Sequence, residues 1–209
     1  MSYWKSSQIT TRGLWLAFCN LILAVCFGFF AYAHALNFLR YQRVSNLLIV
    51  AKETLDAFFF LARRAPSKTS KSAYHWAVGI GATFGPALFR PVERPLDLSS
   101  GQALQFAGLA LQVIGIISLN RSFGIVVANR GIKTNGLYRF VRHPLYSAYI
   151  IQHIGYVINN LSALNCLACA VVTGLQLLRI TFEEGFLTQD PAYLEYTKRT
   201  RWRLIPLIF

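Results

Sequence analysis

The feature that most constrains this chain is the stretch from Leu14 to Leu36, which is apolar and carries no charged side chain. About 20 such residues in one helix cross the roughly 30 Å of hydrocarbon in a bilayer. The composition agrees with that solvent, because 55% of the residues are hydrophobic and only 14% are charged. An ordinary soluble domain has roughly 25% charged residues. The sequence therefore predicts an integral membrane protein.

Five further segments are apolar enough to be helices in the membrane. They run over residues 44–62, 74–89, 101–119, 145–159 and 161–181. The last two are joined by a very short Asn159-Asn160 corner, which predicts an antiparallel helical hairpin. We expect an all-α, polytopic transmembrane bundle of about six segments in one structural unit. Residues 1–119 would form a four-segment scaffold, and residues 120–209 would carry the hairpin and nearly all candidate functional residues.

Charges interrupt the second segment. Lys52, Glu53 and Asp56 lie inside it, and a charge at the bilayer centre costs on the order of 3 kcal/mol. Lys52 and Asp56 are one helical turn apart, so an ion pair between them would lower that cost. We favour this interpretation over a polar cluster that contacts a substrate, and whether residues 44–62 span the membrane completely stays open.

The net charge of +13 does not indicate nucleic-acid binding. The Lys and Arg residues lie mostly in short links between apolar segments, where the positive-inside rule and anionic lipids account for them. One face of the membrane would hold the basic residues within 5–12, 63–71, 121–142 and 198–203, and the other only Arg40, Arg43, Arg90 and Arg94. This bias predicts that both termini and the site between them are cytosolic. The membrane would be a bacterial inner membrane or the endoplasmic reticulum, depending on the host.

Metal and disulfide chemistry are not indicated by the cysteines. Cys19, Cys26, Cys166 and Cys169 all lie in apolar helical segments, where they behave as small hydrophobic residues. We therefore expect no bound metal.

A basic, glycine-bearing segment enters the fifth apolar stretch at Pro144, as is usual for proline in a first helical turn. Tyr138, Arg142, His143 and Tyr146 lie close together at this entrance. They would serve either as anchors at the level of the lipid headgroups or as part of a site.

The end of the sixth segment carries a second polar group. Arg179 and Glu183 are four residues apart on one helix face, and Glu184 lies beside them. An ion pair explains the first two, but it leaves Glu184 unexplained, so we expect a polar cavity there. Glu195 and the basic run from Lys198 to Arg203 are typical of a solvated tail close to the lipid surface.

From Leu119 to Phe209 these residues resemble the isoprenylcysteine carboxyl methyltransferase family and its phospholipid methyltransferase relatives. The shared elements are the Gly136-Leu137-Tyr138 turn, the Arg142-His143-Pro144-Leu145-Tyr146 signature, the asparagine-bearing corner, Arg179 with Glu183-Glu184, then Tyr193, Tyr196 and Ile205-Pro206. Each element is weak alone, and their order and spacing make the set specific.

The resemblance implies a membrane methyltransferase that uses S-adenosylmethionine and releases S-adenosylhomocysteine, with its cofactor pocket on the cytosolic face. It assigns Ile132, Lys133, Tyr138, His143, Pro144, Leu145, Tyr146 and Glu183 to the cofactor. It assigns Arg179 to the methyl acceptor and to catalysis, and Glu184 would serve as the base if the acceptor is an amine. The family usually has a histidine where this chain has Arg130-Gly131-Ile132-Lys133.

The acceptor would be a lipidic or isoprenylated molecule arriving from the membrane, and carboxyl O-methylation of a prenylcysteine-like group is the first choice. A phospholipid or amine N-methyltransferase of the same fold is the nearest alternative. An NADPH-dependent, sterol-reductase-like enzyme and a non-catalytic membrane scaffold are alternatives of other classes. The sequence does not choose among oxygen, nitrogen and sulfur acceptors.

Overall fold

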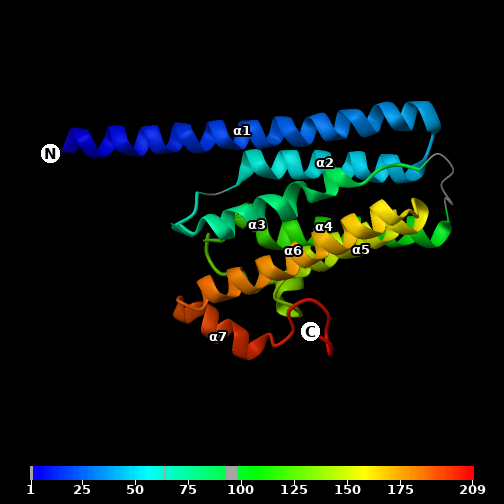
Figure 1. Ribbon diagram of the computed structural model, residues 1–209. Coiled ribbons are helices and arrows are strands. Elements are labelled where there is room, and N and C mark those ends of the chain that lie inside the picture. Colours follow the sequence, from blue (N-terminus) through cyan, green and yellow to red (C-terminus); the bar gives the residue numbers. More distant parts are fainter. Residues whose placement is uncertain (1, 64, 93–97) are drawn as a thin grey trace. The chain divides into compact units, whose positions relative to one another are not determined.

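The computed structural model describes residues 2–63, 65–92 and 98–209, with side chains described from residue 13 onward. The helices in these ranges are α1 (Ser2–Tyr41), α2 (Val44–Ala62), α3 (Ala73–Phe84), α4 (Ser99–Leu119), α5 (Pro144–Asn159), α6 (Ala163–Leu187) and α7 (Pro191–Arg199) (Figure 1). The side chains of Lys5, Arg12, Arg64 and Arg94, which the orientation argument uses, lie outside the described residues.

The chain divides into two compact units, residues 1–65 and residues 66–209. The sequence predicted one unit with a change of role after residue 119. This division puts α3 and α4, which the sequence assigns to the scaffold, in the same unit as residues 120–209.

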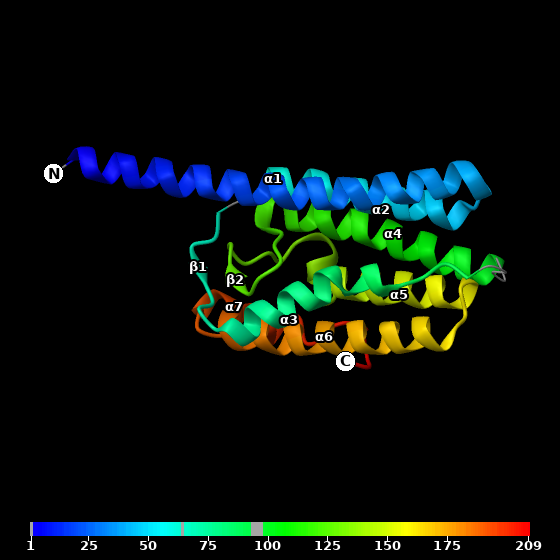
Figure 2. The ribbon, with the colours of Figure 1, turned by 45° about the horizontal axis from the view of Figure 1, so that its top comes forward.

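Unit 1 is an antiparallel pair of helices, α1 and α2 (Figure 2). Phe27 and Phe60 stack between them with ring centroids 5.1 Å apart. Lys52 binds the carboxylates of Glu53 and Asp56 at 2.9 and 3.1 Å, and all three side chains are nearly buried. The predicted ion pair is confirmed. A contact between these residues and a substrate stays a prediction.

Three helices among the described residues are long and apolar enough to cross a membrane, at Gly13–Tyr41, Ser99–Ser122 and Ala163–Leu187. The other three expected segments form α2, α3 and α5, which are shorter or more charged.

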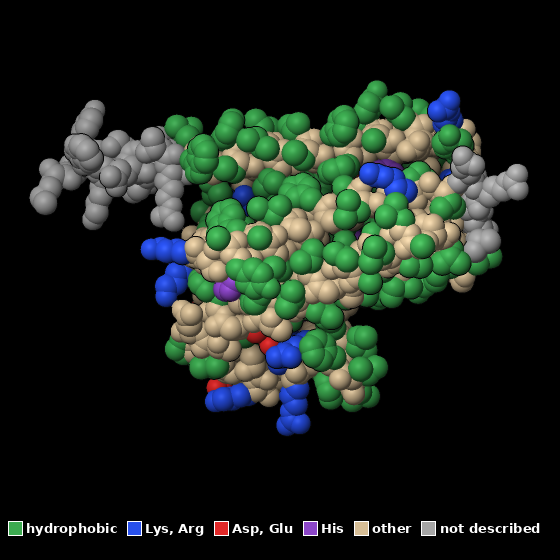
Figure 3. Space-filling model, viewed as in Figure 1, with side chains coloured by type: hydrophobic (Ala, Val, Ile, Leu, Met, Phe, Trp, Pro, Cys, Tyr) green, Lys and Arg blue, Asp and Glu red, His purple; other side chains and the backbone are tan. Residues whose placement is uncertain are grey.

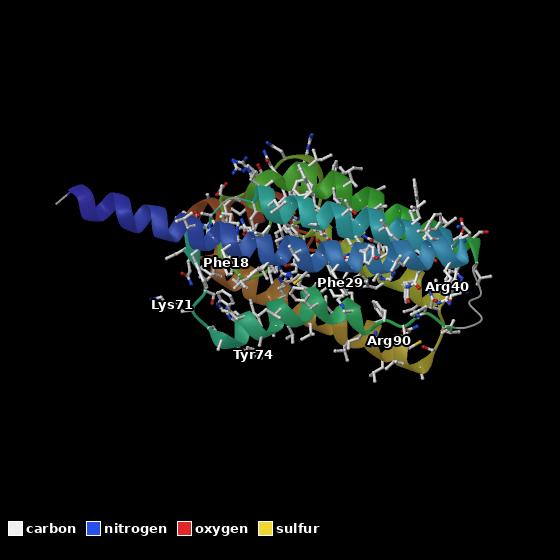
Figure 4. All side chains as sticks on the ribbon, turned by 90° about the horizontal axis from the view of Figure 1, so that it is seen from above. Phe18, Phe29, Arg40, Lys71, Tyr74 and Arg90 are labelled. Atoms are coloured by element: carbon white, nitrogen blue, oxygen red, sulfur yellow. The ribbon has the colours of Figure 1, made fainter. Side chains whose placement is uncertain are left out.

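Large apolar side chains cover the outside of these helices, as Phe18 and Phe29 do along α1 (Figures 3 and 4). The interior instead contains amides, and Gln152 donates a hydrogen bond of 2.9 Å to buried Gln112. This distribution suits a lipid solvent.

In unit 2, glycines on α4 allow α5 to approach closely. Gly101, Gly108 and Gly115 repeat every seven residues and face Asn159, Gln152 and Leu145 on the antiparallel α5. A Cβ built on Gly108 would lie 2.5 Å from Gln152 Cγ and 2.8 Å from the carbonyl oxygen of Ala148. Small residues at such an interface bring helix backbones together in membranes.

Glycines of α3 and of the turn that follows it also allow close packing. Gly81 and Gly85 face Leu175 and Val172 on α6, and Gly79 faces the carbonyl of Ile125. These glycines therefore let α3 and the turn after it lie close to α6 and to the link before α5. A 3-10 turn (Gly85–Leu88) extends α3, so that Lys71 and Tyr74 lie at one end of this segment and Arg90 at the other (Figure 4).

A two-residue antiparallel ladder joins β1 (Lys68–Thr69) to β2 (Ala128–Asn129). Hydrogen bonds from Ser67 N to Asn129 O and from Ser70 N to Val127 O extend it. The segment between α4 and α5 is thereby tied to the segment that precedes α3.

Candidate active site

The N-terminal end of α5 is fixed by the C-terminal segment of the chain. Pro144 occupies the first turn of α5, where its missing N–H costs no helical hydrogen bond. The backbone N–H groups of Arg142 and His143 donate to the carbonyl oxygens of Trp202 and Arg203 at 2.9 and 2.8 Å. These bonds present the buried side chains of His143 and Tyr146 toward α6.

Glu183 on α6 forms the first half of the site. Its Oε1 accepts hydrogen bonds from the Tyr146 hydroxyl at 2.6 Å and from Arg179 Nε at 3.1 Å. The described residues donate no hydrogen bond to Oε2, and the side chain is 21% exposed. Glu183 therefore has one fixed oxygen and one oxygen available to a ligand.

Arg179 is held from three further directions. Its guanidinium donates to Thr83 Oγ1 at 3.3 Å and to the carbonyl oxygen of Gly124 at 2.6 Å. It also lies over the ring of Tyr146, 5.2 Å from the centroid, in a cation–π contact. Thr83 and Gly124 are distant in sequence from Arg179, and no pattern in the sequence indicated them.

Glu184 forms the second half of the site and is locked on both oxygens. Its Oε1 accepts from Arg142 Nε at 2.7 Å and lies 3.0 Å from His143 Nε2. Its Oε2 accepts from Arg203 Nε at 2.8 Å and from the second Arg142 nitrogen at 3.2 Å. An ion cluster therefore surrounds Glu184, and the polar cavity expected beside it stays a prediction. These four bonds point Glu184 away from the role of a free base.

Arg203 differs from the expectation of a solvated basic tail. Its guanidinium reaches the buried Glu184, whereas Glu195 and Lys198 form an exposed ion pair of 3.0 Å on α7. Arg142 also donates to the carbonyl oxygens of Thr200 and Arg201 at 3.1 and 2.9 Å. The C-terminal segment thus forms part of the site wall.

Three tyrosines pack behind the ion cluster. Tyr196 donates a 2.6 Å hydrogen bond to the carbonyl oxygen of Tyr138. Burial is the main cause that raises the pKa of Tyr138, Tyr193 and Tyr196 well above 10, so all three are neutral donors at physiological pH. The Tyr193 hydroxyl is buried and finds no partner among the described residues, which marks it as a donor available to a ligand.

Three other residues that the resemblance assigns to the cofactor lie in different environments. Leu145 points at Gly115 of α4, so only its backbone is left for a cofactor. Ile132 and Lys133 are half-buried in the link before α5, and within the described part of the chain no hydrogen bond or ion pair joins them to Glu183 or Arg179. Their assignment to the cofactor stays a prediction.

Asn129 and Asp190 connect this link to α7. Asn129 Nδ2 donates to Asp190 Oδ2 at 2.8 Å, while Asp190 Oδ1 caps α7 by accepting from Ala192 N at 3.0 Å. Reading the sequence alone missed this pair, although an Asp-Pro start of a helix indicates a capping residue.

Fold and site together define a helical membrane protein whose charged cluster joins α5, α6 and the C-terminal segment. Residues 102–189, which contain Arg142, Arg179 and both glutamates, match the isoprenylcysteine carboxyl methyltransferase (ICMT) family. Residues 102–189 are therefore similar to that family of methyltransferases, and the match covers less than half of the chain.

Two plant proteins are similar to the chain. They are protein-S-isoprenylcysteine O-methyltransferases A and B of Arabidopsis thaliana. Both are 31% identical to this chain, A over 106 residues and B over 107. Each alignment covers 47% of this chain and 54% of the relative. The chain thus spans about half the length of these curated relatives.

Proposed function

We propose that this protein is an integral membrane methyltransferase that uses S-adenosylmethionine and methylates the carboxyl group of an isoprenylated or similarly lipidic acceptor. The observation that carries the proposal is the unequal state of two adjacent carboxylates. Glu184 is locked by Arg142, His143 and Arg203, whereas Glu183 keeps one oxygen unbonded beside Arg179. The family match of residues 102–189 supports the same reaction class.

The residues present fit S-adenosylmethionine chemically. When bound, this cofactor supplies an electrophilic methyl group on a cationic sulfonium. The free oxygen of Glu183 would accept hydrogen bonds from its ammonium group, because a carboxylate is an acceptor of charge-assisted hydrogen bonds. The Tyr193 hydroxyl would donate to one of its polar groups.

Arg179 would bind the acceptor carboxylate with the guanidinium hydrogens that Glu183, Thr83 and Gly124 leave unused. A guanidinium carries five N–H donors, and the three named partners each take one. A carboxylate acceptor is already ionised at neutral pH, so its methylation needs no base. This agrees with the locked state of Glu184, which we assign to positioning Arg142 and His143 and no longer to proton transfer.

The methyl acceptor would reach Arg179 from the membrane, because the flanking helices expose apolar side chains on their outer faces. Membrane lipids surround the protein, and both termini and the site lie on the cytosolic side, as the positive-inside rule predicts. A long-chain acceptor should therefore react much faster than a short, water-soluble analogue with the same carboxyl group. Equal rates for both would refute entry from the membrane.

Cofactor binding is tested by calorimetry on purified protein in detergent. We expect Glu183→Gln to weaken binding of S-adenosylmethionine by tenfold or more, about 1.4 kcal/mol. The matched control is Glu195→Gln, which removes an exposed carboxylate on α7 and should leave binding unchanged. Absence of binding to the unmutated protein would refute the proposed function.

The acceptor is tested with methyl-labelled cofactor and two membrane-soluble probes, an S-farnesylated cysteine with a free carboxyl group and phosphatidylethanolamine. A carboxyl methyl ester releases labelled methanol in alkali, whereas an N-methyl group does not. We expect alkali-labile label on the farnesylated cysteine. Alkali-stable label on the phospholipid would instead establish the amine N-methyltransferase alternative.

A further inference from the structure

The C-terminal loop, residues 201–209, ends in a cluster of exposed apolar side chains. Ile205, Leu207, Ile208 and Phe209 are 50%, 82%, 75% and 42% exposed. We call these four residues the apolar tip. Leaving such side chains in water forgoes about 1.5–3 kcal/mol for each one that could be buried. An apolar cluster of this kind marks a surface that contacts a partner or a membrane.

The apolar tip is an ordered turn. The backbone oxygen of Phe209 accepts hydrogen bonds from the N–H groups of Arg203, Leu204 and Ile205 at 2.9, 2.8 and 3.1 Å. Leu207 adopts a φ of 69°, a left-handed conformation that costs a leucine energy, and its side chain is largely exposed. The fold therefore holds the most exposed leucine of the loop in a strained, outward position.

The C-terminal loop lies beside helices of unit 2, one of which could span a membrane. Figures 1 and 2 draw the red loop alongside the helices of unit 2 and within the length of α4. Figure 3 shows the apolar side chains of this end of the chain as a protrusion beside a charged patch. Because α4 is itself a candidate span, a loop beside it would lie close to the bilayer.

Basic residues flank the apolar tip. Lys198, Arg199 and Arg201 are exposed, and Glu195 is the one acidic side chain in residues 191–209. Each Lys or Arg near an anionic leaflet contributes about 1 kcal/mol to binding. Apolar side chains beside exposed cations are the arrangement of segments that insert shallowly into anionic membranes.

We propose that the apolar tip inserts into the anionic leaflet on the site side and that this insertion stabilises the Arg142–Glu184 cluster. The mechanical link is short, because the loop accepts the backbone hydrogen bonds of Arg142 and His143. Ser147 on α5 also donates to the carbonyl oxygen of Leu204 at 2.7 Å. The proposal concerns membrane contact and does not depend on which molecule is methylated.

Depth is tested in the full chain with all four cysteines replaced by alanine and one fluorophore attached through Leu207→Cys or, as the matched control, Glu195→Cys. The protein is placed in vesicles of phosphatidylcholine with phosphatidylglycerol that contain a lipid carrying a shallow nitroxide. We expect quenching at position 207 to exceed that at position 195 by about twofold or more, since an interfacial segment sits within roughly 5–10 Å of the headgroup boundary. Aqueous iodide should quench in the opposite order.

Charge and coupling are tested in the same vesicles. Lys198→Gln with Arg201→Gln should lower the quenching at position 207 to the level seen in phosphatidylcholine alone. Leu207→Asp should speed hydrogen exchange of the Arg142 and His143 amides, while Leu207→Met should not. Equal iodide access at positions 207 and 195 would overturn the proposal. Protection of position 207 that rises with the protein-to-lipid ratio would overturn it in favour of a second copy of the chain.

Discussion

The close approach of α4 and α5 predicts a large effect of a single methyl group at Gly108. In Gly108→Ala the new Cβ would meet Gln152 Cγ at 2.5 Å, Ala148 O at 2.8 Å and Gln152 N at 3.0 Å, and two of these are backbone atoms that cannot rotate away. Overpacking of this kind costs about 1–3 kcal/mol. Because α5 carries His143 and Tyr146 at its N-terminal end, a shift of α5 would also disturb the candidate site.

The matched control is Gly174→Ala on α6, where a Cβ would meet no atom within 4 Å. Both glycines lie inside helices, so the gain in helix propensity of about 1 kcal/mol is common to the two variants and cancels in their difference. Unfolding in mixed detergent micelles, followed by circular dichroism, should therefore separate the variants by about 1–3 kcal/mol, with Gly108→Ala less stable. Equal stabilities would refute the close packing of α4 on α5.

Three further changes test other parts of unit 2. Tyr146→Phe removes the 2.6 Å donor to Glu183 and should weaken S-adenosylmethionine two- to tenfold in calorimetry, since one hydrogen bond contributes about 0.5–1.5 kcal/mol. Asn165→Ala should lower the unfolding free energy by about 2 kcal/mol or more, because Asn165 makes two hydrogen bonds to the backbone of Arg90 and one to a neighbouring carbonyl. Burial raises the pKa of Tyr196, so its contribution to stability is complete below about pH 10, the unfolded pKa, and is lost as the pH rises toward the folded pKa. Alkaline unfolding curves of Tyr196→Phe should consequently fall less steeply with pH than those of the unmutated protein.

The helices were predictable because each depends on a local property of the sequence. Apolar length identified α1, α4 and α6, and the short corner at Asn159-Asn160 identified the tight connection between α5 and α6. The more extensive packing of α5 against α4 was not predicted. The Arg179–Glu183 pair followed from the four-residue spacing alone. The number of spans was less predictable, since α2, α3 and α5 are apolar yet fall short of a full span in length or charge.

The partners of Glu184 could not be predicted, because they are brought in by tertiary contacts. Arg142 is 42 residues away in sequence and Arg203 is 19 residues away. Both reach Glu184 because the segment after α7 returns to the start of α5, and two backbone hydrogen bonds fix that return. A basic run near a chain end gives no sign in the sequence of which guanidinium folds inward.

The different states of Glu183 and Glu184 follow from helix geometry. Successive residues of an α-helix point about 100° apart, so two adjacent carboxylates on α6 cannot face the same neighbours. Glu183 faces Arg179 and Tyr146, and Glu184 faces Arg142 and Arg203. Two adjacent glutamates on one helix turn can therefore make two different sets of contacts. One carboxylate ties the C-terminal segment to the start of α5, and the other has one oxygen that accepts no hydrogen bond from the described residues.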